Sequence, residues 1–595
     1  MIKKFSFDRH CICLIVLILV SVGLFANTFG NSFVWDDEDI IIGNKYIRSF
    51  KYVPFLFNPR YWNEHAGVKG GKYRPVGMLT FVLDYALWKL NPRGYHITNL
   101  LLHILNVILV YFLTYELILL SRQRGERLKQ AEFLQIPFLT ALFFAAHPIH
   151  VEAVTWIKNR FELLAALFFI LSVFIFIRYK LYKNTRANCP AYFFSLFCFI
   201  LALFSKSAAI TLPFILILCI ICFLPRQKYK KAIMSTLPFF GIIVLYVIFE
   251  FTVLRVFTAN ENEYNLGIYA HILTVVKTIG WYLKLIAIPV NLNLGHIFTI
   301  PHTFLDREVI FSIILLTPIF IMTVRMYRDK KIFSFSAMWL ILSMLPVSNI
   351  IFLSGRPIAE QRVYIPSIGF CLLIALVINK LSSLEVSAIS KSKTKNLAMI
   401  AALITLIFYS TATVRQNAVW KDSLTLWSNT VKNSPQSSRA HNNLGLSYMK
   451  LGKYLEAMAA FRKAIEIDTN QANVYNNLGN TYLMSGRREE AVGFYEQAIK
   501  IDPNYKKTYN NLGIAYCLLG RHEQATAFYQ KAIALDGKYV DAYYNLGNAC
   551  VDINKPEQAI AAYKRALEID PDDQIVSQKL AETYAALGQH KAVRK

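Results

Sequence analysis

Four acidic side chains in a row follow the first long apolar segment of the chain. The heptapeptide Phe33-Val34-Trp35-Asp36-Asp37-Glu38-Asp39 comes directly after the apolar residues 11–29. Carboxylates are costly to place in hydrocarbon, so these side chains belong in water or in a cavity at a membrane boundary, where the Trp35 ring suits the headgroup level. A carboxylate fixed there could remove a proton from a substrate hydroxyl. The alternative is a solvated acidic loop that follows a membrane anchor.

Further ionisable side chains recur beside later apolar segments, and such groups at membrane depth indicate a functional site. They are the basic residues Arg74, Arg160, Lys206 and Arg362, with the acidic or histidine residues Glu162, Glu360, His147, His150 and Glu152. Arginine and lysine on one side of the membrane suit an anionic phosphate. Arg160 could instead pair with Glu162 or anchor at the headgroups, and Lys206 could extend along apolar surface to reach water.

The segment His147-Pro148-Ile149-His150-Val151-Glu152 has donor side chains at a spacing that could hold a divalent metal ion. Such residues also cap helices and order turns, so both interpretations stay open. The Cys219 and Cys222 pair has CxxC spacing, but it lies in an apolar segment without histidine or acidic neighbours. We therefore expect no metal site there, and the nine cysteines indicate no disulfide framework.

The composition is that of a membrane protein for most of the 595 residues. Hydrophobic residues make up 55% of the chain and charged residues 17%, and the formal net charge is +26. The positive charge lies in short clusters between apolar segments, which is typical of membrane orientation and argues against nucleic-acid binding. The start Met1-Ile2-Lys3-Lys4 precedes an apolar run without an evident cleavage site, so we expect an uncleaved first helix.

Eleven segments have the length and composition of membrane spans, since a helix needs about 20 apolar residues to cross a bilayer. They are residues 11–29, 96–119, 133–148, 161–178, 190–205, 207–224, 232–254, 308–324, 332–353, 363–380 and 397–414. This count puts six basic clusters, including Arg124, Arg127, Lys129, Lys183 and Arg186, on the cytoplasmic side. It also predicts that residues 75–90 lie along the membrane surface, that residues 271–289 stay on the outer face, and that the acidic cluster faces outward.

A repeat with a period of 34 residues fills the chain after Ser437. Leu-Gly recurs at Leu444-Gly445, Leu478-Gly479, Leu512-Gly513 and Leu546-Gly547. Alanine and aromatic positions recur in phase, which is the tetratricopeptide signature of two antiparallel helices per repeat. We therefore predict an all-α protein with a multi-span domain at 1–418 and a repeat domain at 419–595. Four full repeats cover 437–572, and a partial fifth covers 573–595.

Asparagine pairs recur on the first helix of the repeats, at Asn442, Asn443, Asn476, Asn477, Asn510 and Asn511. Tetratricopeptide arrays form a concave groove that holds extended peptides or partner helices. A row of asparagines there could hydrogen-bond the backbone of an acceptor peptide, or the side chains could satisfy only local turns and water.

The order of motifs along the chain resembles that of the transmembrane-and-tetratricopeptide-repeat O-mannosyltransferases, whose membrane domain has the GT-C glycosyltransferase fold. The motifs are Val-Trp-Asp-Asp, Tyr-Arg-Pro, Gly-Tyr-His-Ile-Thr-Asn-Leu-Leu-Leu-His, His-Pro-Ile-His-Val-Glu-Ala-Val and Glu-Gln-Arg-Val-Tyr-Ile-Pro-Ser, followed by the repeats. The resemblance implies transfer of a sugar, with mannose the first candidate, from a polyprenyl-phosphate carrier to a serine or threonine hydroxyl. It also implies that the reaction takes place on the outer or lumenal face.

The resemblance also implies roles for single residues. Asp37, with Asp36 as the second candidate, would be the general base, and Arg74 would meet the donor phosphate. Arg160 with Glu162 matches a basic-x-acid motif at the fourth span, and Lys206 matches a lysine that an acid follows in many relatives. Here Ser207 stands in place of that acid. The assignments of Glu360 and Arg362 rest on a spacing that varies in the family.

We therefore expect a multi-pass membrane glycosyltransferase whose repeats recruit the acceptor protein. The expected location is a bacterial inner membrane with the repeats outside, or an endoplasmic reticulum membrane with lumenal repeats. A divalent cation stays open as a cofactor. A non-enzymatic membrane scaffold is the alternative, but a scaffold needs no converging ionisable groups in its outer loops. A lipid transporter would carry polar residues along its mid-membrane helices, where few are found.

Overall fold

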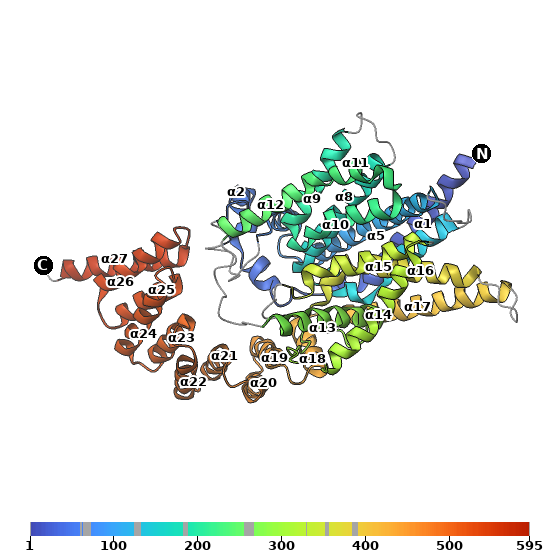
Figure 1. Ribbon diagram of the computed structural model, residues 1–595. Helices are drawn as coiled ribbons and strands as arrows, with labels where there is room; N and C mark the ends of the chain where they lie inside the picture. The colour runs from blue at the N-terminus through green and yellow to red at the C-terminus, as the bar shows by residue number, and fades with distance from the viewer. Residues whose placement is uncertain are drawn as a thin grey trace. The chain divides into compact units, whose positions relative to one another are not determined.

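The structure is a computed structural model, and it describes residues 2–59, Trp62, 73–123, 132–181, 189–254, 267–328, 330–350, 356–383 and 391–593. Its regular elements over these residues are all helices, which confirms the all-α prediction (Figure 1). The chain forms two compact units. One contains residues 1–292 and 298–426, and the other contains residues 293–297 and 427–595.

The first unit, the membrane unit, is built of long apolar helices joined by short helices and turns. Its α-helices are α1 Ile2–Phe25, α2 Val53–Leu56, α4 Pro75–Trp88, α5 Pro92–Gln123, α6 Glu132–Ala146, α7 Val151–Thr155, α8 Arg160–Ile175, α9 Cys189–Ser205, α10 Leu212–Phe223, α11 Tyr229–Met234, α12 Leu237–Thr252, α13 Ile268–Ala287, α14 Arg307–Met326, α15 Lys331–Met344, α16 Ser367–Ser383 and α17 Lys391–Val419. The basic residues Arg124, Arg127, Lys129, Lys183 and Arg186 of the expected cytoplasmic clusters lie outside the described residues.

Seven helices among the described residues are long and apolar enough to cross a membrane. The bent pair Leu134–Ala146 and Pro148–Thr155 makes an eighth if it is one span. Further expected spans correspond to shorter apolar helices, so the count of eleven stays a prediction. Helix α13, which the charge pattern assigns to the outer face, itself has the length and hydropathy of a span. Helix α4 is shorter than the hydrocarbon core is thick, since it runs only from Pro75 to Trp88.

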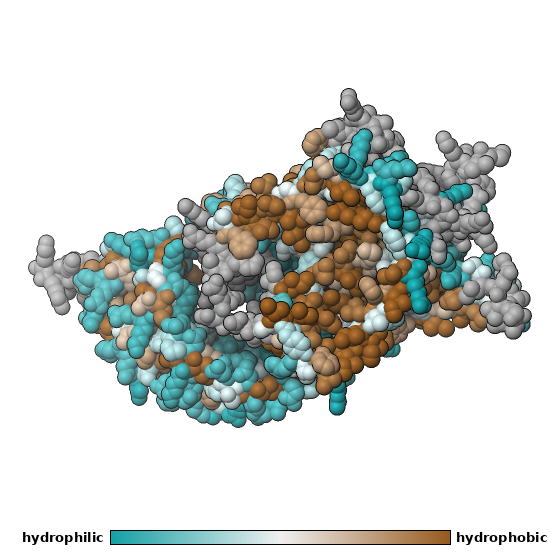
Figure 2. Space-filling model, in the orientation of Figure 1, coloured by the Kyte–Doolittle hydropathy of each residue, from teal (hydrophilic) through white to brown (hydrophobic). Residues whose placement is uncertain are grey.

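Several of these helices expose apolar side chains along much of their length. Only 11% of the most apolar 18-residue stretch of α14 is buried inside the protein, and only 17% of the corresponding stretches that contain α12 and α17. Figure 2 shows apolar side chains gathered over the membrane unit. Water would not favour so much exposed apolar surface, so lipid must cover these helices. This confirms the prediction of a multi-pass membrane protein.

Two local breaks position the segment that leads into α8. Pro148 restricts the residue before it, so α6 ends at Ala146. The chain then bends by 53° into α7. Helix α7 ends at Trp156, which has extended backbone angles, and a 3-10 turn at Ile157–Asn159 leads into α8. Glu152 thereby lies on the short helix α7, and Glu162 lies in the first turn of α8.

The second unit, the repeat unit, contains the helical hairpins that the repeat period predicts. Its helices are α19 Ser438–Lys450, α20 Tyr454–Ile467, α21 Ala472–Met484, α22 Arg488–Ile501, α23 Lys506–Leu518, α24 His522–Leu535, α25 Val540–Asp552, α26 Pro556–Ile569 and α27 Gln574–Val593, preceded by α18 Ser423–Asn433 across the unit boundary. Segment 293–297 packs on the beginning of α19, where the Arg439 guanidinium donates to the Leu294 carbonyl at 2.7 Å.

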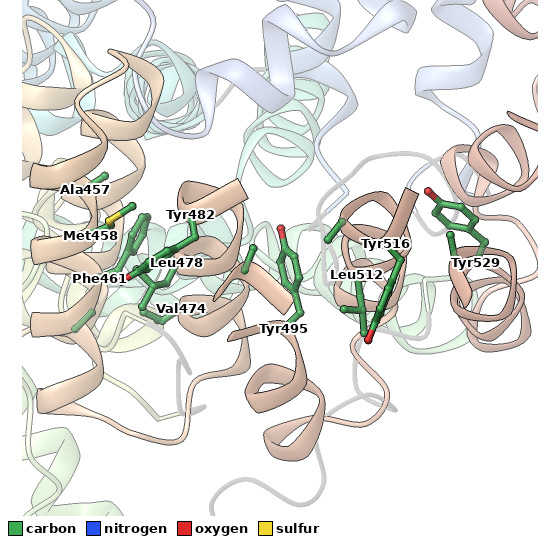
Figure 3. Packing of buried hydrophobic residues seen from close by; sticks show 14 of the residues in the cluster. Ala457, Met458, Phe461, Val474, Leu478, Tyr482, Tyr495, Leu512, Tyr516 and Tyr529 are labelled. Atoms are coloured by element: carbon green, nitrogen blue, oxygen red, sulfur yellow. The ribbon is translucent and has the colours of Figure 1, made fainter. Parts of the chain in front are cut away.

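Small residues allow the paired helices of each repeat to approach closely. Phe461, Tyr495 and Tyr529 are buried against the paired helix of their own repeat, and Figure 3 shows them among the buried side chains of the repeat unit. A Cβ on Gly513 would lie 2.5 Å from the Tyr529 ring. The hairpins turn at Gly452, Gly486 and Gly520, each with the positive φ that glycine adopts most readily. Asn554 takes this place in the fourth repeat and also has a positive φ.

Gly513→Ala should loosen the third hairpin, because the new methyl group overlaps a buried ring and overpacking costs about 1–3 kcal/mol. Gly493→Ala in α22 is the matched control. Its methyl group would meet no atom within 4 Å. It should stabilise the helix by about 0.5–1 kcal/mol. Hydrogen exchange of the full chain measures both effects, in peptides from α23 and α24 for Gly513→Ala and from α22 for Gly493→Ala. Equal protection in both variants would contradict this account of the packing.

Candidate functional site

Asp36 and Asp37 differ sharply in environment although they are neighbours. The Asp37 side chain is fully buried, and its two oxygens accept hydrogen bonds from the backbone N–H groups of Val34 (3.1 Å) and Lys158 (2.8 Å). Burial raises the pKa of Asp37 to about 7, against the lowering effect of these two hydrogen bonds. Asp36 is partly exposed and forms an ion pair with the Lys158 ammonium group.

Three tryptophans hold the acidic loop against the turn before α8. The Trp35 ring stacks on Trp156 with centroids 4.6 Å apart and planes 13° apart, and Trp156 stacks in turn on Trp420 at 5.7 Å. Trp35 has a positive φ. This left-handed conformation is uncommon for a bulky residue and often marks a functional site. The acidic loop and the turn before α8 thus lie side by side, with Trp35 on Trp156 and Asp36 on Lys158.

A third segment, residues 356–362, joins the same region through Glu152. The Glu152 carboxylate pairs with the Arg356 guanidinium at 2.6 Å and accepts hydrogen bonds from the backbone N–H groups of Glu360 (3.0 Å) and Gln361 (3.4 Å). The Arg356 guanidinium lies 5.8 Å from the centre of the Trp35 ring. Glu152 and Glu360 are both buried, so this carboxylate fixes the segment from inside the protein.

Arg74 and Arg362 form a pair of partly exposed cations. The Arg74 guanidinium lies 5.0 Å from the Phe161 ring centre, and its buried Nε–H has no hydrogen-bond partner. Burial, together with the nearby charge of Arg362, lowers the pKa of Arg74 to about 10, against the raising effects of Tyr246 and Glu250. Arg362 donates to the Pro357 carbonyl at 2.9 Å, and neither arginine has an ion-pair partner in the described part of the chain. Two cations held together in this way are suited to a shared anion.

Arg160 is engaged in a buried network instead. Its side chain is fully buried and forms an ion pair with Asp84 at 2.5 Å. Its Nε–H donates to the Asn99 amide oxygen at 2.7 Å, and one terminal N–H donates to the Tyr95 carbonyl at 3.0 Å. With its donors taken up by protein atoms, Arg160 joins α4, α5 and α8 rather than facing a ligand.

Lys206 forms an ion pair with Glu162, so these two predicted residues come together at the start of α8. Five of the predicted residues therefore meet around one turn: Asp36, Asp37, Arg74, Glu162 and Lys206. Lys158 contacts both aspartates, Phe161 lies beneath Arg74, and Glu162 contacts Lys206.

The two predicted histidines have protein partners on both ring nitrogens. His147 bonds the Ile286 carbonyl at 2.9 Å and accepts from the Ile149 N–H at 3.2 Å. His150 bonds the Phe144 carbonyl and the Ser367 hydroxyl, both at 2.8 Å. No three metal-binding side chains converge among the described residues. This donor set does not fit a metal ion, and it matches the alternative in which the histidines order a turn.

The asparagines of the repeat unit form a ladder between consecutive repeats. Asn477 donates to Asn442 at 3.0 Å, Asn511 donates to Asn476 at 3.1 Å, and Asn545 donates to Asn510 at 2.9 Å. Asn443 starts the row and donates to the Arg439 carbonyl of its own helix at 2.8 Å. The first asparagine of each pair is buried, whereas Asn443, Asn477 and Asn511 are partly exposed. The second asparagine of each pair takes part in these bonds only as a donor, through its amide N–H.

Sequence reasoning missed Lys158, Arg356 and the tryptophan stack. Lys158 is separated from Asp37 by 121 positions, and Arg356 from Glu152 by 204 positions. Only the positive φ of Trp35 and the contacts across these distances reveal their part in the site.

The comparisons agree with the resemblance that the motifs indicate. A sequence model described as "Tetratricopeptide repeat" matches residues 436–504 and 506–572. Protein O-mannosyl-transferase F38B6.6 of Caenorhabditis elegans is 28% identical over 468 residues, which cover 76% of this chain and 62% of that protein. Protein O-mannosyl-transferase TMTC3 of Homo sapiens is 26% identical over 502 residues, 76% of this chain and 51% of that protein.

Protein O-mannosyl-transferase TMTC4 of Homo sapiens is 25% identical over 512 residues, 74% of this chain and 64% of that protein. The chain thus spans between about half and two thirds of the length of the curated relatives it matches. Among solved structures, the crystal structure of MamA covers 25% of this chain and 86% of its own, at 26% identity and a TM-score of 0.23.

Arg160→Met should destabilise the membrane unit by about 3–5 kcal/mol, because it leaves the buried Asp84 carboxylate without its partner. Arg160→Met combined with Asp84→Leu should regain most of that loss, since no buried charge is then unpaired. Thermal unfolding of the purified full chain in detergent measures both. A double variant as unstable as the single one would show that Arg160 does not act chiefly through Asp84.

Proposed function

We propose that the chain is a membrane glycosyltransferase that moves a sugar, with mannose the first candidate, from a polyprenyl-phosphate carrier to a protein hydroxyl on the outer or lumenal face. One observation carries the proposal: a buried aspartate with a pKa of about 7 contacts the same turn as Arg74, and neither Arg74 nor the neighbouring Arg362 forms an ion pair with a described carboxylate. The names of the relatives, protein O-mannosyl-transferases, support the same reaction.

Asp37 is suited to be the general base. A serine or threonine hydroxyl is a poor nucleophile, and a base works best with a pKa near the working pH. Each Asp37 oxygen accepts one backbone N–H, which leaves each a further lone pair for the proton of the acceptor. Asp36 forms an ion pair with Lys158, whereas burial raises the pKa of Asp37 to about 7, which favours Asp37 for this role.

Arg74 and Arg362 are suited to the donor phosphate. In the proposed step the acceptor oxygen attacks the anomeric carbon, and its proton passes to Asp37. The bond from that carbon to the phosphate oxygen breaks, and its electron pair stays on the phosphate. Arginine at that oxygen would stabilise the charge that develops there. With a pKa of about 10, Arg74 stays charged at neutral pH. A single displacement of this kind inverts the anomeric configuration.

The repeat unit is suited to hold the acceptor. The ladder uses the N–H side of Asn477 and Asn511, so their amide oxygens are left as acceptors at the same position in consecutive repeats. Such a row can accept hydrogen bonds from the backbone N–H groups of an extended peptide without regard to its side chains. The repeats would then bring many different proteins to one catalytic site.

Asp37→Asn should lower kcat/KM for sugar transfer by about 10²–10⁴, because the base is removed. In the parent protein kcat/KM should rise with pH and level off above about 7, because only the ionised carboxylate of Asp37 accepts a proton. Radiolabelled transfer from polyprenyl-phosphate mannose to an acceptor peptide in proteoliposomes measures both effects.

Two further variants sharpen that test. In Asp36→Asn, kcat/KM should still rise with pH. In Lys158→Met the rise of kcat/KM should move to higher pH, because the Asp36 charge next to Asp37 is then no longer neutralised. Full turnover in Asp37→Asn, or a pH profile that Lys158→Met leaves in place, would remove Asp37 from the role of base.

Asn443→Ala should raise KM for the acceptor several-fold and leave KM for the donor unchanged, because it removes an amide oxygen without breaking a bond between repeats. Asn477→Ala should raise the same KM and also lower hydrogen-exchange protection, since it breaks the ladder bond to Asn442. An unchanged acceptor KM in both variants would show that the peptide does not use this row.

A further inference from the structure

The Arg356 guanidinium has one edge engaged and one edge without a partner. Its Nη1–H pairs with the Glu152 carboxylate at 2.6 Å. Its Nε–H and Nη2–H are buried and have no hydrogen-bond partner. These two groups point the same way from the planar guanidinium, and a buried donor left unpaired lowers the stability of the fold. A protein keeps such an edge where a ligand can occupy it.

Two contacts fix the direction of that edge. Glu152 is itself held by the backbone N–H groups of Glu360 and Gln361, so the ion pair cannot swing freely. The guanidinium also lies 5.8 Å from the Trp35 ring centre, and Trp35 precedes Asp36 and Asp37 directly. The side chain as a whole is 11% exposed, while its Nε–H and Nη2–H edge is buried, so a ligand reaches that edge only when neighbouring side chains move aside.

The charge around Arg356 decides which ligand fits. Glu152 neutralises it, and the Glu360 carboxylate also interacts with it electrostatically. Arg74 and Arg362 repel each other and form no ion pair in the described ranges, and Glu250 attracts Arg74 without pairing with it. A phosphate is therefore drawn to Arg74 and Arg362. A neutral oxygen suits Arg356, because a second anion beside Glu152 would be repelled.

We propose that Arg356 binds two neighbouring hydroxyl oxygens of the transferred sugar through its Nε–H and Nη2–H, and so selects the sugar. Adjacent hydroxyl oxygens of a pyranose are about as far apart as the two oxygens that an arginine edge binds. A site built to hydrogen-bond a hydroxyl strongly rejects a substrate that lacks it. This inference rests on the proposed function, since it assigns the sugar to the site that contains Asp37.

Binding by the purified full chain tests the inference without relying on turnover. The two probes are polyprenyl-phosphate mannose and polyprenyl methyl phosphate, which has the same single charge and no sugar. The ratio of their Kd values reports the sugar alone. The parent protein should bind the mannosyl lipid at least about tenfold more tightly, and Arg356→Lys should reduce that ratio about tenfold. Arg74→Ala should weaken both ligands alike.

Arg356→Lys keeps the positive charge opposite Glu152, so its thermal unfolding should match that of the parent. Arg48→Lys, on an exposed arginine that bonds the Ile42 carbonyl, is the matched control and should leave the ratio unchanged. Deoxy analogues of the mannosyl donor give a second readout. Removal of either of two adjacent hydroxyl groups of the sugar should weaken binding to the parent protein. In Arg356→Lys the same analogues should bind as tightly as the mannosyl donor itself.

An equal loss for both lipids in Arg356→Lys would overturn the inference, because it would place the phosphate or a structural role at Arg356. An unchanged ratio, or no preference for the mannosyl lipid in the parent, would overturn it as well. If the ratio behaves as expected but no sugar reaches any acceptor, the proposed transferase activity fails while the sugar site stands.

Discussion

The arrangement depends on the contact between the acidic loop and the turn that opens α8. The Lys158 backbone N–H holds Asp37, its ammonium group holds Asp36, and Trp35 stacks on Trp156. Without this contact Asp37 would be an exposed carboxylate in a loop, with the ordinary acidity of such a group. Burial against the turn raises its pKa to about 7. Because α8 also carries Phe161 and Glu162, the same turn brings Arg74 and Lys206 to the site.

The two units solve different physical problems. Helices of the membrane unit leave their apolar side chains to lipid, so polar side chains can be concentrated in the turns between them. The repeat unit is polar outside and packs in a period, with one glycine opposite one aromatic ring in each hairpin. Its asparagine ladder uses half of each exposed amide to join neighbouring repeats, which leaves the other half in a fixed direction.

The sequence predicts features that follow from a repeat period or from the length of an apolar segment. It does not predict features that depend on contacts between residues far apart in the chain. The repeat helices and the apolar helices follow from spacing and hydropathy, and Asp37 and Arg74 follow from motifs. The burial that distinguishes Asp37 from Asp36 does not follow from the sequence, because it depends on distant contacts such as the one with Lys158, 121 positions away. In the sequence, Arg160 and Arg362 look alike, because both are basic residues beside apolar segments. Only the Asp84 and Asn99 contacts of Arg160 show that it is enclosed. The span-like α13 shows that charge pattern and length can disagree.

The central claim is that the carboxylates and the repeats share one side of the membrane, opposite the lysine-rich turns. Single cysteines at Lys51, Lys538 and Lys228, all exposed, can be placed in a variant whose native cysteines are replaced. In sealed vesicles of known orientation, a membrane-impermeant maleimide should label the cysteines at positions 51 and 538 from the same side, and the one at 228 only from the other. Labelling of 51 and 538 from opposite sides would contradict the account, because donor and acceptor could then not meet at Asp37.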